Sequence, residues 1–150
     1  MSQPIVDKFS ALQGLKVLMV DDDGDSCELV ATMFSLCGAD ITTCSSVEEA
    51  LERLAVLQPQ LLLSDIAMPL RDGYVLIQSI RARSKEQGGQ IPAIALTAFA
   101  DKLTRQKVLD AGFDRHVAKP IDPFALADVV IDLLTDSHPQ GDSHRSICPT

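Results

Sequence analysis

The sequence predicts one α/β domain whose core is a doubly wound parallel β-sheet. Five short apolar runs alternate along the chain with longer amphipathic segments, the order of strands and helices in such a domain. The runs are hydrophobic at nearly every position, as are strands that helices cover on both faces. The chain has 150 residues, 46% of them hydrophobic, so it can bury the core of one domain and has no room for a second of similar size.

The strands are expected where these apolar runs lie between helical patterns. The predicted strands are residues 15–20, 39–44, 60–65, 91–97 and 115–118. Pro92 stands at the start of the fourth run, where its missing N–H group is tolerated.

The first two helices are predicted from one apolar face each and from residues typical of helix ends. The first ends at Gly38, and its apolar face consists of Cys27, Val30, Phe34 and Cys37. The second begins after Ser46, with Glu49 at the capping-box position. Its buried stripe is predicted to be Val47, Ala50, Leu51 and Leu54.

Three more helices follow in the second half of the chain. One is predicted over residues 73–83, followed by a loop over residues 85–90, and another from about 101 to 111, where Gly112 ends it. Asp122 opens the last helix, with Pro123 at its first position. Its inward side chains are predicted to be Phe124, Ala127, Val130 and Leu134.

The two ends of the chain are predicted to lie outside the domain. Residues 1–14 form an N-terminal arm, residues 15–134 the domain and residues 135–150 a flexible C-terminal tail. The chain starts without the pattern of a signal peptide, and no apolar run approaches the roughly 18 residues of a membrane span. No CxxC pair occurs among Cys27, Cys37, Cys44 and Cys148. These observations predict a soluble cytoplasmic protein with reduced thiols and no membrane insertion.

The charge balance excludes one broad class of function. The chain has 13 Lys and Arg residues and 21 Asp and Glu residues, which give it a formal net charge of -8. A free-standing acidic domain is a poor direct ligand of nucleic acid, because phosphate contacts require Lys and Arg. Lys102, Arg105 and Lys107 give the fourth helix a modest basic edge, which we interpret as a solvated helix face.

Polar side chains follow four of the predicted strands at the point where each strand ends. They are Asp21, Asp22 and Asp23 after the first strand, Asp65 at the end of the third, Thr97 at the end of the fourth and Lys119 after the fifth. Parallel strands bring their carboxyl ends to one edge, where ligands bind in open α/β sheets. Converging carboxylates raise each other's pKa unless a cation lies between them, and all-oxygen ligands suit Mg²⁺. The sequence therefore predicts a magnesium site with the groups that phosphoryl transfer needs.

These motifs resemble the receiver domain of two-component response regulators. The resemblance rests on VDDD (20–23), SDIAMPLRDGY (64–74), LTA (96–98) and AKPI (118–121), and it extends from residue 15 to about residue 134. It implies a flavodoxin-like (βα)5 fold with strand order 2-1-3-4-5. It also implies a phosphorelay function, in which the partners are a histidine kinase or histidine phosphotransfer protein and a downstream protein target.

The resemblance assigns the acceptor and its metal ligands. Asp65 looks like the phosphoryl acceptor, with Met68, Pro69 and Gly73 shaping the loop behind it. Asp22 looks like a direct Mg²⁺ ligand, Asp21 like a ligand through water, and the backbone carbonyl of Ala67 like a further ligand.

The resemblance also assigns the residues that respond to phosphorylation. Thr97 looks like the switch hydroxyl that turns onto the phosphoryl group, and Lys119 like the cation that pairs with it. The bond between Lys119 and Pro120 is expected to be cis. The face made by the fourth helix, the fifth strand and the fifth helix is expected to carry partner docking or a dimer contact.

The sequence departs from the family pattern at the switch and at the positions that tune dephosphorylation. His116 occupies the position where receivers commonly carry Tyr or Phe, so it is a candidate switch residue with a titratable ring. Ala67 and Phe99 occupy the two tuning positions, and neither side chain can orient an attacking water. We therefore expect a long-lived acyl phosphate and at most slow autodephosphorylation.

Two other functions stay open at this point. One is a receiver-like interaction module that does not respond to phosphorylation. The other is a Mg²⁺-dependent phosphohydrolase with an Asp nucleophile, resembling haloacid dehalogenases. Such enzymes place a second Asp two residues after the nucleophile, whereas this chain has Ala67 there. The leading interpretation is a phosphoacceptor signalling domain that is not a turnover enzyme.

Overall fold

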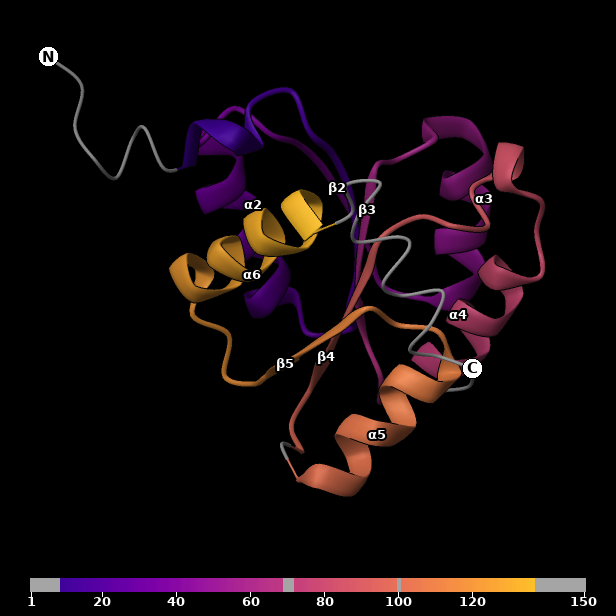
Figure 1. Ribbon diagram of the computed structural model, residues 1–150. Helices are drawn as coiled ribbons and strands as arrows, with labels where there is room; N and C mark the ends of the chain where they lie inside the picture. Colours follow the sequence, from indigo (N-terminus) through magenta and orange to yellow (C-terminus); the bar gives the residue numbers. More distant parts are fainter. Residues whose placement is uncertain (1–8, 69–71, 100, 137–150) are drawn as a thin grey trace, which may run out of the picture.

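Five parallel strands form one sheet in the computed structural model, which describes residues 9–68, 72–99 and 101–136. The strand order is β2-β1-β3-β4-β5, as predicted, and every neighbouring pair is parallel (Figure 1). The strands are β1 (Lys16–Val20), β2 (Asp40–Cys44), β3 (Leu61–Asp65), β4 (Ala93–Thr97) and β5 (Arg115–Ala118). β3 and β4 are buried at every position because they lie inside the sheet and are covered on both faces.

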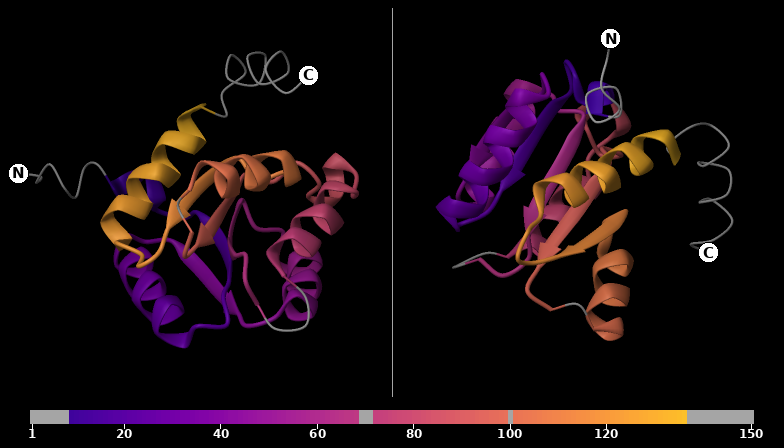
Figure 2. Two further views of the ribbon diagram at one scale, coloured as in Figure 1. Left: turned by 90° about the horizontal axis from the view of Figure 1, so that it is seen from below. Right: turned by 90° about the vertical axis from the view of Figure 1, so that its left-hand side faces the viewer.

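Helices cover both faces of this sheet. The helices are α2 (Gly24–Leu36), α3 (Val47–Leu57), α4 (Gly73–Arg81), α5 (Lys102–Ala111) and α6 (Pro123–Asp136), with short 3-10 turns η1 (Ser10–Leu12) and η2 (Lys85–Gln87). α2 and α6 pack on one face, and α3, α4 and α5 pack on the other (Figure 2). The sheet therefore separates two hydrophobic clusters, and the fold is the doubly wound α/β architecture that the sequence predicts.

Side-chain oxygens cap the starts of the α-helices, and at α6 Asp122 Oδ1 accepts from the N–H groups of Phe124 (3.0 Å) and Ala125 (3.4 Å). Ser46 Oγ accepts a hydrogen bond from the Glu49 N–H (3.2 Å), as expected, while Glu49 Oε1 accepts from the N–H of Ser45 (3.1 Å). Asp23, Asp72 and Asp101 act in the same way at the starts of α2, α4 and α5. Gly38 follows α2 with a φ of 89°, a left-handed conformation that glycine adopts without strain.

The structure corrects two details of the predicted helices. The helix predicted over residues 73–83 ends at Arg81, because Ala82 is its C-terminal cap, and the following loop contains the turn η2. The prediction that Phe124 faces inward is wrong, since 55% of this residue is exposed. Leu134, also predicted inward, is half-buried and packs against the cluster under α2 and α6, as expected. The buried stripe of α6 consists of Leu126, Ala127, Val130 and Leu133.

The chain before β1 packs onto the domain where the structure describes it. Leu12 is fully buried and Phe9 is 6% exposed, and both belong to the cluster under α2 and α6. The Phe9 ring also contacts the Phe124 ring, with centroids 5.9 Å apart. Residues 1–8 and 137–150, which make up most of the predicted arm and tail and include Cys148, lie outside the described residues. The division at residues 14 and 134 stays a prediction.

No helix between residues 9 and 136, with the gaps at 69–71 and 100 left aside, has the length and hydrophobicity that crossing a membrane requires.

Candidate functional site

The strand register explains why the predicted site residues meet. Val20 of β1 pairs with Ser64 of β3, so the residue after each, Asp21 and Asp65, lie side by side at the sheet edge. Thr97 of β4 pairs with Ala118 of β5, which places Lys119 immediately beyond Thr97. Residues up to 98 positions apart in the sequence therefore converge at the carboxyl ends of the strands.

Lys119 joins the two buried carboxylates of this edge. Its Nζ lies 2.9 Å from Asp21 Oδ2 and 3.4 Å from Asp65 Oδ2. Asp21 is 1% exposed and Asp65 is 5% exposed, and Thr97 and Ser64 are the other buried polar residues among those described. Because buried charges are costly unless they are paired, Lys119, Asp21 and Asp65 form one electrostatic unit.

Asp21, Asp22 and Asp65 could hold a cation together. Their carboxylate oxygens lie within 4.8 Å of one another, and Asp22 is the exposed member at the rim. Asp21 Oδ1 accepts a hydrogen bond from the Asp23 N–H (2.9 Å). Asp21 Oδ2 is buried and accepts no hydrogen bond of regular geometry. It forms an ion pair with Lys119. A set of carboxylate oxygen ligands that includes the buried Asp21 Oδ2 fits Mg²⁺, which prefers oxygen ligands.

The electrostatics of the cluster perturb both Asp65 and Lys119. Burial, together with the neighbouring negative charge of Asp21, raises the pKa of Asp65 to about 6, although Lys119 opposes the shift. Burial acts to lower the pKa of Lys119, but the hydrogen bonds and charges of Asp21 and Asp65 outweigh it and raise that pKa. Lys119 is therefore an ammonium ion at neutral pH, held against two carboxylates.

The backbone behind the acceptor candidate is closely packed. The Gly73 N–H donates to the carbonyl of Ile66 (2.8 Å). A Cβ atom at Gly73 would clash with the carbonyl oxygen of Asp65 and lie 3.0 Å from Ile66 Cα. Met68 packs against the cluster under α3 and α4, whereas Pro69 lies outside the described residues. Gly73 is therefore required by a close approach between the start of α4 and the backbone of Asp65 and Ile66.

Thr97 and His116 meet through the backbone of Phe99. The Thr97 hydroxyl oxygen accepts a hydrogen bond from the Phe99 N–H (3.0 Å), and His116 Nε2 lies 3.1 Å from the Phe99 carbonyl oxygen. The Lys119 N–H donates to the Thr97 carbonyl (2.7 Å), and the bond between Lys119 and Pro120 is cis, as expected. Thr97 and His116 are thus brought together, while the predicted ligand Ala67 is exposed two residues past Asp65.

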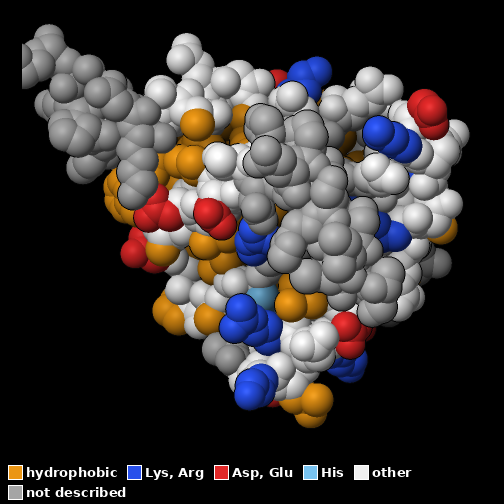
Figure 3. All heavy atoms as spheres, viewed as in Figure 1, with side chains coloured by type: hydrophobic (Ala, Val, Ile, Leu, Met, Phe, Trp, Pro, Cys, Tyr) orange, Lys and Arg blue, Asp and Glu red, His pale blue; other side chains and the backbone are white. Residues whose placement is uncertain are grey.

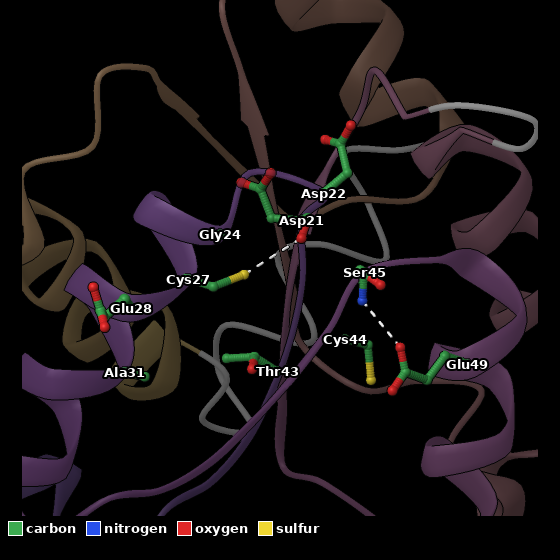
Figure 4. Close-up of a pocket in the computed structure, with 10 residues that line it drawn as sticks. All are labelled: Asp21, Asp22, Gly24, Cys27, Glu28, Ala31, Thr43, Cys44, Ser45 and Glu49. Carbon is green, nitrogen blue, oxygen red and sulfur yellow. Dashed lines mark hydrogen bonds between the residues drawn. The ribbon is translucent and has the colours of Figure 1, made fainter.

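A cavity of about 400 Å³ opens beside the carboxylates between α2 and α3 (Figure 4). Cys27 Sγ donates to the carbonyl of Asp21 (3.4 Å), so a residue that the sequence indicates only as part of an apolar face also supports the site. Burial raises the pKa of the Cys27 and Cys44 thiols to about 11. Both are unpaired thiols with little thiolate at neutral pH.

Ser64 is a second supporting residue that sequence reasoning missed. It is fully buried, and its hydroxyl donates to the carbonyl of Asp65 (2.9 Å). The sequence feature that could have indicated Ser64 is a hydroxyl residue inside an otherwise apolar strand, next to the candidate acceptor Asp65. Asp23, in contrast, is the N-terminal cap of α2, where a negative charge complements the helix dipole.

Comparison with known proteins identifies the class. Residues 17–131 match the response regulator receiver domain, so the chain belongs to this family. The family is a signalling domain and not a turnover enzyme. Receiver domains generally bind Mg²⁺ at an acidic cluster, and they interact with histidine kinases or phosphotransfer proteins and with downstream targets.

Individual relatives agree with this assignment. The chain is 42% identical to an uncharacterized 14.6 kDa protein of Leptolyngbya boryana, over 81% of this chain and 92% of that one. It is 35% identical to hybrid signal transduction histidine kinase D of Dictyostelium discoideum, over 82% of this chain and 8% of the kinase. It superposes on the receiver domain of the Francisella response regulator 1452 with a TM-score of 0.73 and 28% identity, covering 81% of this chain and 98% of that domain.

Proposed function

We propose that Asp65 accepts a phosphoryl group from a phosphohistidine of a histidine kinase or phosphotransfer protein, and that the product switches a protein-interaction surface. The observation that carries this proposal is the position of the Asp65 carboxylate, within 4.8 Å of the other two carboxylates and 3.4 Å from the Lys119 ammonium. Such an arrangement combines a nucleophile with the positive charge that a phosphoryl group requires.

The transfer is a displacement at phosphorus. An ionised oxygen of Asp65 forms the new P–O bond, the P–N bond of the phosphohistidine breaks, and its electron pair stays on the imidazole nitrogen. The Lys119 ammonium lies where it can pair with the phosphoryl oxygens. Asp21, Asp22, Asp65 and the Ala67 carbonyl would hold Mg²⁺, which would neutralise charge on those oxygens.

Thr97 is proposed to turn toward the bound phosphoryl group, which pairs with Lys119, and thereby to change the surface over α5, β5 and α6. Figure 3 shows Lys and Arg side chains and hydrophobic side chains gathered over α5. The exposed residues there include Leu103 (79%) and Phe99 (65%), beside the exposed Lys102, Arg105 and Lys107. This face is proposed to bind the downstream protein or a second copy of the chain.

The acyl phosphate is proposed to be long-lived. Ala67 and Phe99 offer no polar side-chain atom to orient an attacking water. The lifetime is measured by following loss of the adduct in Mg²⁺ after removal of the phosphodonor. Decay within seconds would contradict this part of the proposal. The unpaired thiols support the cytoplasm as the compartment where this transfer takes place.

Intact-mass spectrometry tests the acceptor directly. The protein is incubated with Mg²⁺ and acetyl phosphate, together with Asp65→Asn and with Asp40→Asn, which changes an exposed carboxylate of β2. A single labile phosphoryl adduct is expected on the wild type and on Asp40→Asn, and none on Asp65→Asn. No adduct on a wild type that binds Mg²⁺ would overturn the proposal and favour an interaction module that does not respond to phosphorylation.

A further inference from the structure

The strand β2 lies at one edge of the sheet and leaves part of its backbone unpaired. The Asp40 N–H donates to the Leu15 carbonyl (2.8 Å), toward β1. Because alternate residues of a strand direct their backbone groups to the same neighbour, Ile41 and Thr43 direct theirs away from β1. In the part of the chain that the structure describes, the N–H groups and carbonyls of these two residues have no hydrogen-bond partner.

This edge lacks the features that commonly keep edge strands from pairing with other chains. β2 has the sequence DITTC, in which Ile and Thr favour a strand and no Lys, Arg or Pro opposes an added one. The opposite edge strand, β5, begins with Arg115 and is closely followed by Pro120. The next outward residue after β2 is Ser45, whose N–H donates to Glu49 Oε1 (3.1 Å). The open row therefore ends there and has the length of one short added strand.

The cavity between α2 and α3 lies beside this edge and is acidic on both sides. Thr43 and Ser45 line it together with Glu28 of α2 and Glu49 of α3, and Figure 4 shows the two residues of the edge between the two glutamates. The lining residues include no Lys, Arg or His. The other two acids of the cavity are candidate magnesium ligands. Glu28 and Glu49 are therefore the carboxylates that a partner at this edge would meet.

We propose that β2 binds an extended segment of a partner protein, which adds a strand at this edge and carries two successive Lys or Arg residues. Successive side chains of a strand point to opposite faces of the sheet. One basic side chain therefore meets Glu28 on the α2 side, and the next meets Glu49 on the α3 side. A second copy of β2 fits less well, because its own charged residue, Asp40, is negative. This binding does not depend on phosphorylation of Asp65.

A ¹⁵N nuclear magnetic resonance titration tests the added strand. The probe is the peptide acetyl-Thr-Val-Lys-Lys-Val-Thr-amide, added to the wild type in Mg²⁺. At saturation the Ile41 and Thr43 amides are expected to shift and to exchange with solvent at least about fivefold more slowly. A peptide N-methylated at each internal residue keeps the charges but loses backbone donors, and it is expected to bind at least about fivefold more weakly. Equal affinities of the two peptides would leave only charge attraction and would overturn strand addition.

Substitutions test the charges and the edge separately. Glu28→Lys is expected to weaken peptide binding at least about fivefold, whereas Glu52→Lys, at an exposed residue of α3 outside the cavity, should stay within about twofold of wild type. Thr43→Pro removes an outward N–H and is expected to abolish binding while circular dichroism shows the fold intact.

Two results would overturn the proposal. One is an absence of shifts at Ile41 and Thr43, and the other is equal binding by Glu28→Lys and Glu52→Lys. Protection of the two amides that grows with protein concentration, without peptide, would instead assign the edge to a second copy of the chain. Asp65→Asn is expected to bind the peptide as the wild type does, so a failure of the acceptor proposal leaves this result unchanged.

Discussion

At the scale of single residues, Asp65 is the proposed phosphoryl acceptor, and the folded state holds its ionised side chain at an energetic disadvantage. Burial and the charge of Asp21 raise its pKa from 3.8 to about 6, so its ionised form is less favourable in the folded protein than in the unfolded one. Lys119 offsets part of this effect. A bound cation would offset more, which links the stability of the domain to the chemistry of its site.

Replacing Asp65 is therefore expected to stabilise the metal-free protein. At pH 7.5 in the presence of a chelator, Asp65→Asn should raise the free energy of unfolding by about 1–3 kcal/mol. Above the folded-state pKa the destabilising charge is fully present, and it disappears as the pH falls through the range from about 6 to 3.8. Chemical denaturation across this pH range measures the effect. Equal stabilities of the two proteins at pH 7.5 would contradict the expectation, and the exposed Asp40→Asn serves as the control.

Gly73 illustrates a residue whose smallness the site requires. Gly73→Ala would push a methyl group against the carbonyl of Asp65, and backbone atoms have no flexible end that could move aside. The substitution is expected to lower the free energy of unfolding by about 2–4 kcal/mol and to slow phosphoryl uptake. Gly24→Ala is the control, because a Cβ there meets nothing within 4 Å and should change stability by at most about 1 kcal/mol. Similar melting temperatures for both variants would count against this account.

At the scale of elements, one side chain ties the end of α4 to the chain around it. Arg81 donates from Nη1 to the carbonyls of Gly89 (3.0 Å) and Ile91 (2.7 Å) and from Nε to that of Gly112 (2.9 Å). Its Nη2 also lies 3.3 Å from a carboxylate oxygen of Asp114. The planar guanidinium is suited to this pattern, because it presents several donors in one fixed geometry.

Arg81→Lys is expected to lower the free energy of unfolding by about 1–3 kcal/mol, since an ammonium group cannot satisfy all these acceptors at once. Thermal denaturation of the variant measures the change. The same substitution at the exposed Arg53 of α3 should alter stability by less than about 0.5 kcal/mol. A melting temperature of Arg81→Lys equal to that of the Arg53 control would contradict the proposed role of the guanidinium.

Helix boundaries show how far local patterns extend. Ser46 with Glu49, and Gly38, mark ends that the structure confirms, because a side-chain cap or a left-handed glycine depends only on its near neighbours. Phe124 was predicted inward and is exposed, because a helical apolar pattern does not say which residues of the first turn meet the sheet. That depends on how α6 lies across its neighbours.

At the scale of the whole molecule, the core extends beyond the strands and helices of the family match. That match begins at residue 17, yet Leu12 is fully buried in the cluster under α2 and α6. Leu12→Ala is expected to lower the free energy of unfolding by about 2–5 kcal/mol. Leu36→Ala, at a leucine that is 83% exposed, should change it little. Equal denaturation midpoints for the two variants would show that the segment before β1 does not contribute to the core.

The sequence by itself determined the fold class and the candidate site, because apolar runs and the order of polar residues at strand ends are local properties of the chain, and its motifs determined the family that the chain resembles. Asp21, Asp22, Asp65, Thr97 and Lys119 could be named as candidates from that pattern, and the structure places them at one edge. Only the tertiary structure decided how Lys119 divides its contacts between Asp21 and Asp65. The same is true of the hydrogen bonds by which Cys27 and Ser64 support the carboxylates. It also holds for the contacts of His116 and Thr97 with the backbone of Phe99. Such contacts join residues on different elements, and their distances follow from strand register and helix packing, which no local pattern specifies.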